Sequence, residues 1–156
     1  MKPQRRQLTF ATYGDAIAEA ERLLAGGYRQ AGNWTLGQNC RHLADFMRYS
    51  LDGFPTKLRL PWPITAMLRW MFFREKQMAK PMPAGMPTAP FLKQTEPADD
   101  AELVAEFVKQ CRRVDAQQGE FQKSPIVGRA EPSLWKRVHL KHAELHLGML
   151  VPETAE

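Results

Sequence analysis

The sequence is poor in the residues and patterns that mark several large classes of protein. Cysteine occurs only at Cys40 and Cys111, too few for a disulfide framework, which favours a reducing compartment. No run of about 18 apolar residues is present, so we predict no integral membrane segment. Runs of alternating Val, Ile and Thr between turn residues are also missing, so we expect almost no β-sheet.

Basic residues exceed acidic ones without forming a dense basic run. The chain has 22 Lys and Arg, 17 Asp and Glu, a net charge of +5 and a pI near 9.4. The densest basic points are QRR, CRR and WKR, so we interpret the surface as one of mixed charge and expect no nucleic-acid partner. Arg5 and Arg6 could begin an export signal, but acidic residues rather than an apolar segment follow them. We therefore predict a cytoplasmic protein without a signal peptide.

Apolar residues recur at helical spacing in four segments. The second segment opens with Thr35 and has Gln38 three residues later, which is the spacing of a capping box. The fourth has Pro132 near its start, where proline is favoured. We predict an all-α fold with one domain, residues 1–156, built as a four-helix bundle. The helices are expected over residues 13–25, 35–52, 98–117 and 132–149.

A long crossover, residues 54–96, separates the second and third predicted helices. It holds seven of the 12 prolines and five of the eight methionines. We expect an extra helix over about residues 63–79 and then an extended loop, because prolines crowd together there. Its wide apolar surface leaves four roles open: core cover, a lid over a pocket, a homodimer interface or contact with a membrane surface. Burial is also expected for Trp34, Trp135 and either Trp62 or Trp70.

Three of the four histidines lie in one apolar run near the end of the sequence, VHLKHAELHLGML. On a helix, His142 and His146 stand one above the other on the buried face, and His139 flanks them. His42 lies on the inward side of the second predicted helix. If these helices are neighbours, His42, His142 and His146 can bind one metal ion and leave a position open, as in catalytic zinc sites. Asp45, one turn from His42, is the candidate to orient an imidazole from behind.

A competing interpretation treats these histidines as ordinary core or surface residues with local hydrogen bonds. For a single histidine that interpretation would be preferred. An i, i+4 pair on a buried face, with the remaining histidine on another inward-facing helix, favours a metal site. Zinc and nickel are the metals that we expect, and cobalt or ferrous iron would accept the same ligands.

Two stretches of sequence, NWTLGQNCRHLAD and HAELHLGML, resemble the DinB/YfiT-like superfamily of four-helix bundles. In that superfamily a histidine of an HLAD-like motif and an H-x-x-x-H pair of the last helix bind a divalent metal. The resemblance implies His42, His142 and His146 as the ligands. RRQLTF and HLADFMRYSLDGFP are further similar to a branch described only as a domain of unknown function. The chain departs from the H-H-x-G-Q ending of many relatives, since Leu145 replaces one histidine and the glutamine is missing.

The same resemblance implies a metal-dependent enzyme that acts on a small molecule. Superfamily members include transferases that join low-molecular-weight thiols to electrophiles, and hydrolase-like proteins. An open metal position lowers the pKa of a bound thiol or water. His139 is the candidate general base, and Arg41 or Arg48 could hold an anionic substrate, although most helix arginines are simply exposed charges. The alternative is a non-catalytic, stress-related bundle that holds a metal or a small ligand.

Overall fold

The described part of the chain is mostly helical, as predicted. The computed structural model describes residues 1–153, and within that range it has six α-helices, one short 3₁₀ helix and one two-stranded sheet. In chain order the elements are α1 (Tyr13–Gly26), β1 (Tyr28–Gln30), α2 (Leu36–Asp52), α3 (Trp62–Phe72), α4 (Glu75–Met78), η1 (Pro90–Leu92), α5 (Asp100–Ala116), α6 (Pro132–Gly148) and β2 (Leu150–Pro152).

Three of the four long helices begin at a residue whose side chain caps the first turn. Thr35 Oγ1 accepts a hydrogen bond from Gln38 N, and Gln38 Oε1 accepts one from Thr35 N, so the predicted capping box of α2 is confirmed. Thr12 and Asp15 form the same box at the start of α1. Asp99 caps α5. These caps satisfy backbone N–H groups that a helix cannot pair internally.

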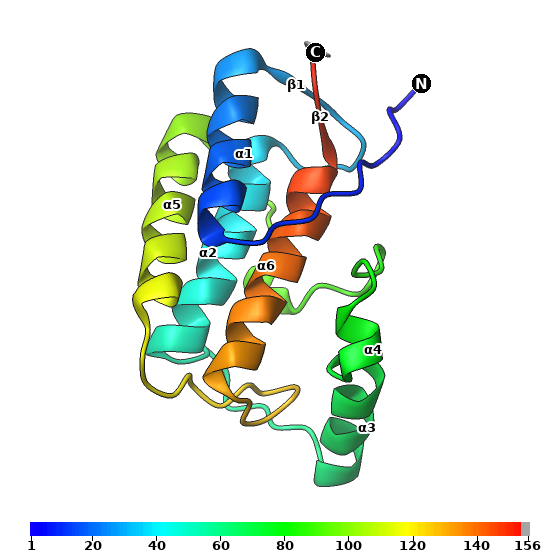
Figure 1. Cartoon of the computed structure of the whole chain (residues 1–156), viewed down its shortest axis with the longest axis vertical. Coiled ribbons are helices and arrows are strands. Elements are labelled where there is room, and N and C mark those ends of the chain that lie inside the picture. The colour runs from blue at the N-terminus through cyan, green and yellow to red at the C-terminus, as the bar shows by residue number, and fades with distance from the viewer. Residues whose placement is uncertain (154–156) are drawn as a thin grey trace.

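The four long helices pack side by side, with α2 in contact with α1, α5 and α6. Helices α1 and α6 run in one direction, and α2 and α5 run in the other (Figure 1). The parallel pair α2 and α5 is joined by the long crossover, which returns the chain to the end where α2 began. This arrangement places α6, with its histidines, directly against the His42 helix.

The core lies between these four helices and is mostly apolar, with a few buried polar side chains. Its largest fully buried side chains include Phe107, Leu36, Met47 and Leu147. Both cysteines are buried free thiols whose pKa values are raised, chiefly by burial. We expect a core of this extent to stabilise the fold without a metal ion. Its members are Tyr13, Ala16, Ala20, Leu23, Leu36, Cys40, Leu43, Ala44, Met47, Leu103, Val104, Phe107, Val108, Cys111, Val114, Phe121, Trp135, Ala143, Leu147 and Leu150.

The segments next to the end of α6 hold that end in place. Strand β2 follows α6 and pairs antiparallel with β1, Arg29 opposite Val151. From the N-terminal segment, Arg6 N donates to Gly148 O at 2.9 Å and the Arg6 guanidinium donates to Leu150 O at 2.8 Å. A Cβ atom on Gly148 would lie 2.6 Å from Arg6 O, so the close approach needs glycine. The sequence did not predict these strands, because three residues are too few to show an alternating pattern.

The crossover carries two α-helices instead of the one predicted over residues 63–79, and η1 near its end. Helix α3 ends at Phe72, and the short α4 begins at Glu75. Both lie beside the four long helices rather than among them (Figure 1). Met78 of α4 is buried, whereas α3 is largely exposed. Across the described residues, every helix is too short or too polar to traverse a bilayer.

The tryptophans divide between the core and the crossover. Trp135 is buried and Trp34 is partly buried, in line with the sequence. Trp62 and Trp70 are 80% and 62% exposed, so the expectation that one of them is buried is wrong. The sequence showed that α3 is apolar, but not that it stands outside the core.

Candidate metal centre

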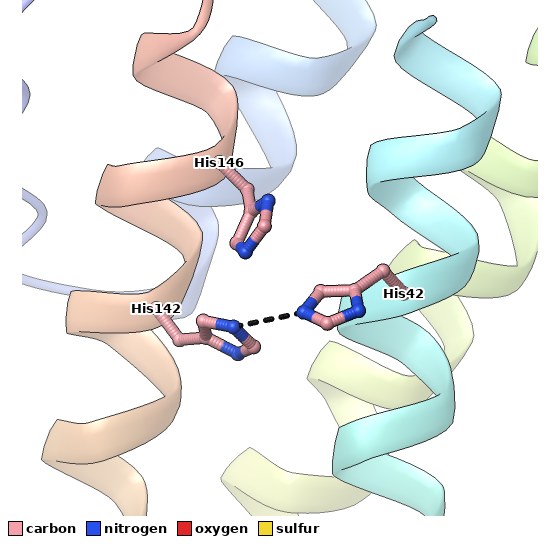
Figure 2. Close-up of side chains that lie close together, drawn as sticks. All are labelled: His42, His142 and His146. Carbon is pink, nitrogen blue, oxygen red and sulfur yellow. Dashed lines mark hydrogen bonds between the residues drawn. The ribbon is translucent and has the colours of Figure 1, made fainter. Parts of the chain in front are cut away.

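Three histidines from two helices come together between α2 and α6. His42 projects from α2, and His142 and His146 project from successive turns of α6, so that the three rings face one another (Figure 2). One ring nitrogen from each residue lies within 4.8 Å of the others. The ring centroids are 4.4 to 4.8 Å apart. We call these three residues the histidine cluster.

Aromatic rings enclose the cluster on two sides. Trp34 stacks on His146 with 5.6 Å between ring centroids and lies 5.0 Å from His42. The Phe46 ring meets His142 edge-on at 5.1 Å. His42 is buried, and the two α6 histidines are partly exposed. The cluster therefore has aromatic neighbours on two sides, and two of its three residues are partly exposed to solvent.

The outer nitrogen of His42 is bonded to a backbone carbonyl. His42 Nδ1 lies 3.0 Å from Leu92 O, which can only accept, so Nδ1 carries the proton and donates. The neutral ring then presents an unprotonated Nε2 to the cluster. Leu92 belongs to η1, so the end of the crossover orients this imidazole.

Asn39 orients His146 in the same way. His146 Nδ1 lies 3.0 Å from Asn39 Oδ1. The Asn39 amide nitrogen donates to Trp34 O at 3.2 Å and Thr35 O at 2.9 Å, which identifies the other amide atom as the oxygen. His146 Nδ1 is therefore the donor, and its Nε2 keeps a free lone pair. Such bonds from behind fix the ring orientation of metal-binding histidines.

His142 faces His42 at a distance that requires a proton or a cation between them. The two Nε2 atoms are 3.0 Å apart, and His42 Nε2 is a bare lone pair. His142 Nδ1 is buried and has no hydrogen-bond partner within the described residues. Nitrogens bound to one tetrahedral zinc ion lie about 3.4 Å apart, close to this spacing. The donor set therefore fits a divalent cation.

Burial keeps the cluster in its neutral form. Desolvation lowers the pKa of His42, and for the other two rings the neighbouring histidines add to the lowering. The pKa of His146 falls to about 3, and that of His142 lies well below its usual value. Neutral imidazole is the form that binds metal, so protons compete weakly at this site.

His139 lies outside the cluster. It is completely buried and stacks on Trp135 with 5.5 Å between centroids. Ser50 Oγ donates to Met47 O and therefore accepts from His139 Nε2 at 2.8 Å. Burial lowers the pKa of His139 to about 3.

The charged residues singled out in the sequence make other contacts. Asp45 Oδ1 accepts a hydrogen bond from Arg48 at 2.7 Å, and Arg41 donates to Pro97 O at 3.4 Å. Attraction to Asp45 raises the pKa of His42, a smaller effect than the lowering by burial. An orienting role for Asp45 stays a prediction.

Asn39 and the Leu92 carbonyl are the parts of the site that sequence reasoning missed. Asn39 could have been found, because it lies one turn before His42 on the same inward face of α2. Leu92 could not, because it contributes a backbone atom and is 50 residues away from His42 in the sequence.

The fold and the cluster define a mostly helical protein in which three histidines could hold a metal ion. The chain belongs to the family described as "Protein of unknown function (DUF1569)", whose model matches residues 2–153. No curated protein and no solved structure matches the chain.

Proposed function

We propose that His42, His142 and His146 hold one divalent cation, zinc or nickel, with a further position open to a small molecule. On this proposal the chain is a single DinB-like domain in the cytoplasm. It works there as a metal-dependent enzyme, a thiol S-transferase or a hydrolase. The observation that carries the proposal is the 3.0 Å approach of the His42 and His142 Nε2 atoms, with the outer nitrogen of His42 already bonded to Leu92 O.

The bound cation would lower the pKa of a thiol or water at the open position, which makes either a nucleophile near neutral pH. The residues of the chain itself orient the ligands and line the open position. Leu92 O and Asn39 Oδ1 fix two of the imidazoles before any ion arrives, so little side-chain freedom is lost on binding. Trp34 and Phe46 give the open side apolar walls suited to an apolar electrophile.

His139 has a structural role in this proposal. A general base works best when its pKa is near the pH of the reaction, whereas the His139 pKa is about 3. The ring is also completely buried between aromatic neighbours. In this proposal, protons pass directly between the molecule bound at the open position and the solvent.

The proposal is tested first by metal binding. Protein purified without a histidine tag is analysed for metals and then, after chelation, titrated with cobalt(II), zinc and nickel. We expect one ion per chain and, with cobalt, the visible absorption of a nitrogen-rich site. His142→Ala should abolish binding, whereas His139→Gln, on the same helix but outside the cluster, should bind normally. Wild-type binding of less than one ion per chain, or equal binding by both variants, would refute the site.

Turnover separates the enzyme from the non-catalytic alternative. The metal-loaded protein is assayed with low-molecular-weight thiols and a model electrophile, and with ester and amide substrates. Activity that is lost on chelation and in His142→Ala supports the enzyme. Full metal occupancy without turnover of any of these substrates would support the metal-holding alternative instead.

A further inference from the structure

The outward face of α3 is apolar throughout. Five side chains share this face and are exposed to solvent, with Met67 at 52% and Trp70 at 62%. At about 100° per residue they cover roughly a third of the helix circumference. They are Pro63, Ile64, Met67, Trp70 and Met71. Solvent-facing helix surfaces normally carry polar and charged side chains, so this face has the opposite character.

The single charged residue of α3 points the other way. The Arg69 guanidinium donates hydrogen bonds to Val127 O and Arg129 O, in the loop before α6. The partly buried Leu68 lies on the same inward side. Helix α3 is therefore held to the rest of the molecule by its polar side, and its apolar side is presented outward.

The excess positive charge of the protein is concentrated around this helix. Residues 57–80 contain six of the 22 Lys and Arg residues and one of the 17 Asp and Glu residues. The rest of the chain therefore holds equal numbers of both, and the whole net charge of +5 falls in this segment. Its single acidic residue, Glu75, is paired with Arg137. The exposed basic residues that precede and follow α3 in this segment are Lys57, Arg59, Arg74, Lys76 and Lys80, and the Arg74 guanidinium lies over the Trp70 ring.

We propose that α3 docks on the surface of an anionic phospholipid bilayer, with its axis in the plane of the interface. An apolar helix face with tryptophan on it and cations beside it is the pattern of interfacial helices. The face would enter the boundary between headgroups and acyl chains, and the flanking cations would meet lipid phosphates. At about 1.5 Å per residue the helix is roughly 16 Å long, half the thickness of a bilayer core, so it lies on the membrane.

The positive charge of residues 57–80 favours an anionic lipid surface over a second copy of the chain. A second copy of the chain would bring two segments of net +5 face to face, and like charges repel. A nucleic acid would satisfy the cations and could stack on Trp70, but it offers Ile64, Met67 and Met71 little apolar surface. An anionic bilayer satisfies both the charge and the apolar face.

Flotation of the full chain with lipid vesicles tests the proposal. We compare vesicles of phosphatidylcholine alone with vesicles that contain about 30% phosphatidylglycerol, at low and high salt. Binding should require the anionic lipid and weaken with salt. Tryptophan emission should shift to the blue on binding, because Trp62 and Trp70 leave water.

Matched variants localise the contact. Met67→Ser with Trp70→Ser removes apolar surface from an exposed face, so the fold should survive and lipid binding should fall about tenfold or more. Leu24→Ser, at an exposed apolar residue of α1, is the control. Lys57→Glu with Arg59→Glu should also weaken binding about tenfold or more. Lys109→Glu with Arg112→Glu makes the same charge change on α5 and should not.

Any one of the following results would overturn the proposal. One is the same vesicle binding by the wild type and the Met67 and Trp70 double variant. Another is an equal loss of binding in the two charge-reversal pairs, which would show that vesicle binding depends on the net charge of the protein and not on the charges near α3. The third is a wild-type dimer in solution that the Met67 and Trp70 changes dissociate, or tight binding to nucleic acid in place of vesicles.

Discussion

Acid should destabilise the fold through the buried His139, and the size of this effect can be worked out from its surroundings. In the unfolded chain the pKa of this histidine is about 6.5, whereas burial lowers it to about 3 in the fold. Between these values the unfolded chain binds more protons than the folded one. The free energy of unfolding therefore increases as the pH rises from about 3 to about 6.5, and it decreases again as the pH falls through the same range.

The expected loss is large compared with the stability of a small domain. At about pH 5 the unfolded state gains about 2 kcal/mol from protonating one such histidine, whereas the same residue contributes almost nothing at about pH 7.5. Typical domains unfold at a cost of about 5 to 15 kcal/mol. The other three histidines also have lowered pKa values and steepen the dependence.

The substitution His139→Gln measures how much of the acid-induced loss of stability is due to His139. His139→Gln cannot titrate, and its amide keeps a donor for Ser50 Oγ. Urea denaturation of chelated protein is measured for both proteins at about pH 7.5 and about pH 5. The wild type should lose about 2 kcal/mol more than the variant over this range. Equal losses would show that His139 is hydrated or protonated in the fold, and would refute the packing described for it.

The remaining predictions concern the cluster and its support. Asn39→Ala should lower metal affinity about 10- to 100-fold, as for other residues that orient a ligand, and competition with a chromophoric chelator measures the change. Metal affinity should persist below about pH 6, where free histidine would already be protonated, because burial lowers the ligand pKa values; a metal titration at about pH 5.5 checks this. Chelation should leave the helical circular dichroism signal unchanged, since the core is apolar and continuous without the ion.

The sequence predicted the parts of this protein that depend on local periodicity. Thr35 and Gln38 mark the start of α2 through side chains three residues apart, and His142 and His146 share a face because four residues make about one turn. The meeting of His42 with them followed from assuming that two apolar faces pack together, which they do. Each of these inferences uses only the geometry of a helix.

The crossover shows where such reasoning fails. Periodicity located an apolar helix there, but an apolar face on its own indicates burial, and the structure turns that face of α3 outward. The inward side is held by Arg69 bonding to carbonyls of Val127 and Arg129, a contact between distant segments that no local pattern encodes. The concentration of charge in residues 57–80 was visible in the sequence, but it is spread over 24 positions without a dense run.

The N-terminal segment passes close over Gly148, at the end of the helix that carries His142 and His146. Arg6 donates hydrogen bonds to the carbonyls of Leu147 and Gly148 at the end of α6 and to the carbonyl of Leu150 in β2. His146 lies within one turn of these residues. Trimming the chain to just before Tyr13 would remove these hydrogen bonds, the Thr12 cap of α1 and the contacts of Leu8 and Phe10 with the core. On the proposed function, such a fragment would hold His146 less firmly and bind metal more weakly than the intact chain.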